Sequence, residues 1–126
     1  MTKVSVSLLF TFFSLVLSAR AAWASETIDL VIIETLPVPI VTESRVEFEK
    51  ELARIMPDHE LNITIYNAEG SEIRAKAMLK ELADKPAPDL IVSAATLATR
   101  ALNASDDFLD VPKLFMVVSA PVEEGI

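Results

Sequence analysis

Short β-branched runs alternate with amphipathic helical stretches along residues 28–118, and this alternation constrains the fold more than any other feature. The four strand-like runs lie at 28–33, 61–66, 89–92 and 113–118. This order predicts an α/β fold with a doubly wound parallel sheet of about four strands. Such sheets bind ligands outside the carboxyl ends of their strands, so the alternation also indicates where a site should lie.

The first helical stretch is bounded by prolines and by a capping signal. Pro37 and Pro39 predict an extended loop after the first strand, because proline disfavours a regular helix. Ser44 and Glu47 have the spacing of a capping box, which predicts that the helix begins there. Pro57 is expected to end it. The apolar stripe of this helix is expected to contain Phe48, Leu52, Ile55 and Met56.

The later connections carry similar signals. Ser71 is a plausible N-cap for a second helix, whose buried stripe would contain Ala75, Met78, Leu79 and Leu82. Residues 93–96 are expected to form a small polar loop, and 98–102 predict a short third helix. The run 61–66 alternates apolar and polar residues, which favours a position near the sheet edge.

Composition restricts the kinds of site and partner that are possible. The chain has no cysteine, one histidine and two glycines. This excludes a disulfide scaffold, the usual zinc and Cys-His sites, and glycine-rich nucleotide loops, so no cofactor is expected. The formal net charge of -8 argues against nucleic acid as a partner.

Residues 1–24 have the features of a secretory signal peptide. Lys3 supplies a positive charge, residues 4–17 are apolar but too short to span a bilayer comfortably, and Ala22 to Ala24 form an A-x-A cleavage site. We expect export to the periplasm and a mature chain from residue 25. The alternative is an uncleaved segment that anchors the protein in the membrane.

Three loop segments carry a family resemblance. Asn67 to Gly70 resembles an Asn-Ala-Gln-Gly turn, 89–98 resembles an Asp-Leu-Ile-Val…Ala-Thr-Pro-Ala segment, and 111–122 resembles an Ile-Pro-Ile-Val-Phe…Val-Thr-Asp-Pro-Val segment. In this order, the chain resembles the periplasmic substrate-binding proteins of ABC importers, specifically the tryptophan/tyrosine-type group. The resemblance covers about 28–122.

The resemblance implies a fold and a role. Residues 25–126 would form a partial N-terminal lobe of the type I periplasmic-binding-protein-like kind, an incomplete piece of a longer two-lobed protein. That protein would be a non-enzymatic solute-binding component of an ABC importer. It would bind a small polar or amino-acid-like molecule in an interlobe cleft and present it to the permease. The departures from the family's loops, including Leu97 in place of proline, imply a different ligand or impaired binding.

Two other classes of function remain open. As the second hypothesis, the same lobe can serve as the extracytoplasmic sensing domain of a membrane-bound signalling receptor, with a signalling domain fused to it. An enzyme on a doubly wound sheet is disfavoured, because no nucleophile–base pair is visible in the sequence.

Six residues are candidates for contact with a ligand. Thr96 would bind a ligand carboxylate through its hydroxyl and nearby backbone N–H groups, or would simply cap the third helix. Ala95 is included because it belongs to the resembling segment. Thr35 and Ser119 follow the first and fourth strands and would flank the same crevice, ordinary loop polarity being the alternative.

The other two candidates follow the first two strands. Glu34 would bind a ligand ammonium group, unless it is merely a solvated acid. Asn67 would touch the ligand, unless it serves only as a turn-forming residue. Because all six lie near strand ends, the sequence predicts one site at the carboxyl edge of the sheet.

Overall fold

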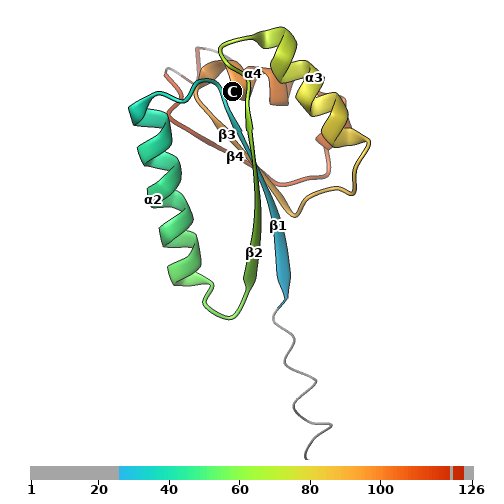
Figure 1. Cartoon of the computed structure of the whole chain (residues 1–126). Coiled ribbons are helices and arrows are strands. Elements are labelled where there is room, and N and C mark those ends of the chain that lie inside the picture. The colour runs from blue at the N-terminus through green and yellow to red at the C-terminus, as the bar shows by residue number, and fades with distance from the viewer. Residues whose placement is uncertain (1–25, 120, 124–126) are drawn as a thin grey trace, which may run out of the picture.

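The computed structural model describes residues 26–119 and 121–123, so the predicted signal peptide lies outside the described residues. Strands and helices alternate along the described chain, which confirms the predicted α/β fold (Figure 1). Within this range, no helix is both long enough and apolar enough to cross a membrane. The elements are β1 (Thr27–Glu34), α2 (Pro39–Ile55), β2 (Glu60–Asn67), α3 (Glu72–Ala83), β3 (Leu90–Ala94), α4 (Thr96–Asn103), η2 (Asp106–Phe108) and β4 (Lys113–Met116).

The strands form one parallel sheet in the order β2-β1-β3-β4. The chain passes outward from β1 to β2 through α2, and then crosses back over β1 to β3 through α3. The direction of winding therefore reverses between β1 and β3, which confirms the doubly wound topology. β2 lies at one edge, as its alternating pattern predicted.

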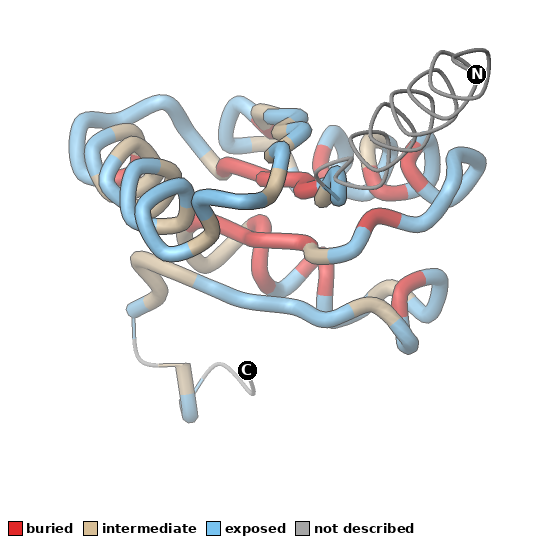
Figure 2. The backbone as a smooth tube through the Cα atoms, turned by 90° about the horizontal axis from the view of Figure 1, so that it is seen from below, coloured by how far each residue is buried: buried red, intermediate tan, exposed pale blue. Residues whose placement is uncertain are grey.

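Helices cover both faces of the sheet. α2 lies over one face, while α3 and α4 lie over the other (Figure 1). In β1, Leu30 and Ile32 pack toward α2, and Val31 and Ile33 pack toward α3 and α4. Buried residues follow the middle of the fold, and exposed ones follow its outer turns (Figure 2). A central strand that is apolar on both faces is typical of such sheets.

The first helix begins earlier than the sequence indicated. α2 starts at Pro39, with Val38 as its N-cap, so the capping-box prediction for Ser44 and Glu47 is wrong. Proline fits the first helical turn because an N–H group there has no partner within the helix. The carbonyl oxygen of Val38 accepts instead from the N–H groups of the third and fourth residues after it, at 3.0 Å each.

Two features of the apolar stripe of α2 also differ from expectation. Phe48 and Leu52 pack against the core as predicted, but Ile55 is 57% exposed, because it is the last residue of the helix. Val41, which was not expected in the core, is buried. The earlier helix start adds a turn near the carboxyl edge of the sheet, and Val41 lies in this turn.

The predictions for the second helix are confirmed except at Met78, which is half-buried while Ala75, Leu79 and Leu82 are buried, and one loop is shortened. Ser71 is the N-cap of α3, and its hydroxyl accepts from the N–H of Arg74 at 3.3 Å. Ser93 and Ala94 belong to β3 rather than to the loop after it. The connection from β3 to α4 is therefore the single residue Ala95, which makes this turn tight.

Candidate functional site

The reversal point between β1 and β3 places Thr35 beside the start of α4. The backbone N–H of Thr35 donates to the carbonyl oxygen of Ala94 at 3.0 Å. The Thr35 hydroxyl oxygen accepts from the N–H of Ala98 at 3.0 Å, although the two residues are 63 positions apart. Thr35, which directly follows β1, therefore caps α4 from a distant part of the sequence.

Thr35 also reaches the turn after β2. Its carbonyl oxygen accepts from the N–H of Gly70 at 2.8 Å, and the carbonyl oxygen of Glu34 accepts from Ala68 at 2.8 Å. The carboxyl ends of β1, β2 and β3 are consequently held together around one threonine. This confirms that Thr35 lies at the predicted edge, while its contact with a ligand stays a prediction.

The first turn of α4 keeps several polar groups available. Ala95 is the N-cap, so the alternative that Thr96 caps this helix is wrong. Within the described residues, the N–H groups of Thr96 and Leu97 and the Thr96 hydroxyl have no hydrogen-bond partner. Because unpaired N–H groups and the helix dipole favour negative charge, this turn can accept an anionic group.

Ala95 has a backbone conformation that is unusual for alanine. Its φ is 69° and its ψ is 165°. This region is populated almost only by glycine, and strain there is often found at functional sites. Two other non-glycine residues with positive φ, Glu69 and Val117, follow β2 and β4. Strained backbone thus gathers along the carboxyl edge of the sheet.

A buried pair of hydroxyls lies beneath this turn. Ser93 and Thr99 are each about 1% exposed, and their hydroxyl oxygens are 2.9 Å apart. Thr99 also donates to the carbonyl oxygen of Ala95 at 3.0 Å. Sequence reasoning assigned Ser93 to a loop and overlooked Thr99. The signal that was available is a serine inside an otherwise apolar strand.

Glu34 is neither solvated nor free. It is 4% exposed, and its Oε1 accepts from Nε of Arg45 at 2.6 Å. Hydrogen bonds to Glu49 and to Glu34 raise the pKa of Arg45 above its ordinary value. The carboxylate of Glu34 is therefore compensated by a cation from α2, and the alternative of an ordinary solvated acid is wrong.

Asn67 and Ser119 contribute less to this edge. The Oδ1 atom of Asn67 accepts from the N–H of Glu69 at 2.7 Å, which confirms Asn67 as a turn-forming residue. The left-handed residues of this turn are Glu69 and Gly70. Ser119 is exposed, and among the described residues no hydrogen bond joins it to the other candidates. β4 ends at Met116 rather than at the predicted residue 118, so Ser119 lies beyond the strand end, and its role stays a prediction.

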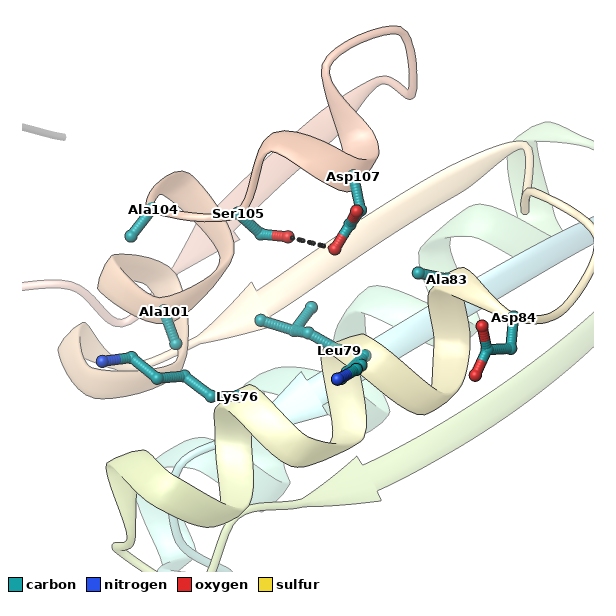
Figure 3. A pocket seen from close by; sticks show the side chains of 9 residues that line it. Lys76, Leu79, Ala83, Asp84, Ala101, Ala104, Ser105 and Asp107 are labelled. Atoms are coloured by element: carbon teal, nitrogen blue, oxygen red, sulfur yellow. Dashed lines mark hydrogen bonds between the residues drawn. The ribbon is translucent and has the colours of Figure 1, made fainter.

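Two hollows lie away from the carboxyl edge. A groove of about 340 Å³ separates α3 from α4 and η2, with Leu79 and Ala101 among its lining residues (Figure 3). A second hollow of about 240 Å³ lies beside Tyr66 and Lys85. None of the six candidate residues lines either one. Across residues 26–119 and 121–123, no group of three acidic or histidine side chains is placed to hold a metal.

Comparison with known proteins gives two solved structures. No protein-family model and no curated protein matches the chain. The ligand-free, open structure of CD0873, a substrate-binding protein with adhesive properties from Clostridium difficile, is 26% identical, with a TM-score of 0.64 over 77% of this chain and 32% of that one. The ABC domain from Streptococcus pneumonia in complex with L-Trp is 22% identical, with a TM-score of 0.68 over 79% of this chain and 33% of that one.

These matches concern the fold of the chain and the general class of protein that it resembles. The chain spans about a third of the length of each structure that it matches. Its four parallel strands and their helices match the lobes of substrate-binding proteins. The neighbours are binding proteins rather than enzymes, which is consistent with the expectation of a non-enzyme.

Proposed function

We propose that this chain is part of the first lobe of an extracytoplasmic solute-binding protein that supplies an ABC importer. The protein binds a small polar or amino-acid-like molecule in a cleft and presents it to the permease. Support comes from the likeness to a substrate-binding protein and to a domain crystallised with L-Trp. The features of residues 1–24 support a periplasmic location.

One observation carries the site assignment: the unpaired first turn of α4 lies beside Thr35 at the reversal point of the sheet. In doubly wound folds, ligands bind at this point. The N–H groups of Thr96 and Leu97 supply two donors for a ligand carboxylate. The Thr35 oxygen accepts from Ala98, so its own proton remains available for a third hydrogen bond.

The charges at this edge support binding of the ligand's carboxylate, rather than of its ammonium group, by this lobe. A carboxylate at the α4 turn is favoured by the helix dipole, and each charge-assisted hydrogen bond contributes about 1.5–3 kcal/mol. Glu34 is already paired with Arg45 at 2.6 Å. An ammonium group at Glu34 would have to compete with this guanidinium, so the cation is expected to be bound elsewhere.

Isothermal titration calorimetry of the full-length secreted protein against the amino acids and small carboxylates tests the proposal. Thr96→Val removes a hydroxyl at the site, and we expect it to weaken binding by about tenfold, equivalent to about 1.4 kcal/mol. Thr64→Val is the matched control, because Thr64 is an exposed residue of β2. Absence of binding to every probe would refute the function. Binding that Thr96→Val leaves unchanged would refute the site.

A further inference from the structure

We propose that Ser93 and Thr99 are positioning residues, which hold Ala95 in its left-handed conformation and thereby fix the first turn of α4. Only the ligand measurement in its test rests on the proposed function. The hydrogen bonds that hold Ala95 all lie within residues 93–116.

The hydroxyls form a chain with a defined direction. The Thr99 hydroxyl donates to the carbonyl oxygen of Ala95 at 3.0 Å. A hydroxyl has one proton, so Ser93 must be the donor in its 2.9 Å hydrogen bond to Thr99. The order of donation therefore runs from Ser93 through Thr99 to Ala95. Every member of this chain has a partner, although both side chains are about 1% exposed.

The peptide groups on both sides of Ala95 are held in place. Its carbonyl oxygen accepts from the hydroxyl of Thr99 at 3.0 Å and from the N–H of the same residue at 3.2 Å. Its N–H donates to the carbonyl oxygen of Met116 at 3.0 Å. A non-glycine residue keeps such a conformation only where its surroundings over-determine it. The contacts of Ala95 meet this requirement, and the Thr99 hydroxyl is the one supplied by a side chain.

If Ser93 and Thr99 served only to fill the interior, apolar side chains would do so at a lower cost in free energy. The pair lies next to the apolar cluster that contains Ile91, Ala98 and Leu102. Burying a hydroxyl is unfavourable unless it is hydrogen-bonded, whereas valine and alanine have no polar group to satisfy. The hydroxyls restrict the orientation of the group that they bind, because a hydrogen bond limits both distance and angle. The restricted element is Ala95, the single residue between β3 and α4.

The consequence for the site is preorganisation. Ala95 directs the chain so that Thr96 opens the helix and Ala98 reaches the hydroxyl of Thr35. The unpaired N–H groups of Thr96 and Leu97 are then held in one orientation before a ligand arrives. Fixing binding groups in advance improves affinity, because less conformational freedom is lost on binding.

The test combines amide NMR of the free, full-length protein with titration by sodium acetate as a minimal carboxylate. We expect Thr99→Val to move the amide resonances of Thr96 and Leu97 and to weaken acetate binding by about tenfold. Thr99→Ser keeps the hydroxyl and should retain the wild-type resonances and affinity. Thr64→Val should leave these two amides unchanged. A Thr99→Val protein with unmoved amides would overturn the proposal.

Two further variants keep the test decisive if Thr99→Val does not fold. Ala95→Gly in the Thr99→Val background should recover folding and the amide positions, because glycine adopts positive φ without strain. Ser93→Ala removes the donor that orients the Thr99 hydroxyl but leaves the bond from Thr99 to Ala95, so it should move the amides less than Thr99→Val does; a larger shift than that of Thr99→Val would contradict the direction of the chain. Loss of acetate binding in every protein, including the wild type, would refute the ligand assignment, while the free-protein amides would still decide the positioning role.

Discussion

Nε of Arg45 donates to Oε1 of Glu34 at 2.6 Å, and this bond fastens α2 to the carboxyl end of β1. The side chains are 17% and 5% exposed, respectively. Arg45 also donates from Nη1 to Glu49 at 2.7 Å, so one guanidinium serves two carboxylates. Because Glu34 is largely removed from water, Arg45 is the cation that compensates its carboxylate.

Removing Arg45 should therefore cost more than removing a surface arginine. We expect Arg45→Met to lower the free energy of unfolding by about 3 kcal/mol, because it leaves a buried carboxylate without its partner. Arg54→Met is the control: its ion pair with Glu51 is 69% and 59% exposed, and water screens such a pair, so its removal should change the free energy of unfolding far less. Urea unfolding followed by circular dichroism measures both. Equal losses would contradict the special role of Arg45.

Replacing Ala95 with glycine should stabilise the protein. Relief of the strained conformation is worth about 1–3 kcal/mol, and the greater freedom of glycine in the unfolded chain costs about 0.5–1 kcal/mol. The net expectation is a gain of about 1 kcal/mol in the free energy of unfolding. Ala77→Gly, on an exposed part of α3, should instead cost about 1 kcal/mol. Destabilisation by both variants would show that Ala95 is not strained.

The sheet could be predicted from sequence because its signals are local. Buried β-branched runs mark the strands, and the polar alternation at 61–66 placed β2 at an edge. The carboxyl edge followed from topology alone, and Thr35 does meet the start of α4 there. Periodicity within one segment was sufficient to locate the strands.

The contacts that build the site could not be predicted, because they join distant segments. The cap of α4 comes from Thr35, 63 residues away, and the partner of Glu34 lies 11 residues along the chain on α2. No local pattern encodes either pairing. The predicted start of α2 was wrong for a different reason. Pro39 is compatible both with a loop and with a first helical turn, and only the packed structure distinguishes the two.

Substitution of Ser71 and of Ser44 compares the observed N-cap of α3 with the residue that was wrongly predicted to begin α2. Ser71→Ala should lower the free energy of unfolding by about 1 kcal/mol, because its hydroxyl accepts from the N–H of Arg74 at the start of α3. Ser44 lies inside α2, so Ser44→Ala should be neutral or stabilising by about 0.5 kcal/mol. Thermal unfolding of the two variants provides the comparison. A larger loss for Ser44→Ala would support the capping box that the structure replaces.

The pair of Glu51 and Arg54 gives a dependence on pH. Arg54 donates to the two carboxylate oxygens of Glu51 at 2.8 and 2.6 Å, and these bonds lower the pKa of Glu51 from its ordinary value of 4.5. Because the folded-state pKa is depressed, the stability from this pair is present above pH 4.5 and is lost as the pH falls through the folded-state pKa. We expect Arg54→Gln to return the pKa of Glu51 toward 4.5, as measured by carboxyl NMR titration, and to make the loss of stability below that pH shallower. Since both groups are exposed, high salt should reduce the difference between the variant and the wild type. A Glu51 titration that is the same in both proteins would mean that the pair does not persist in solution.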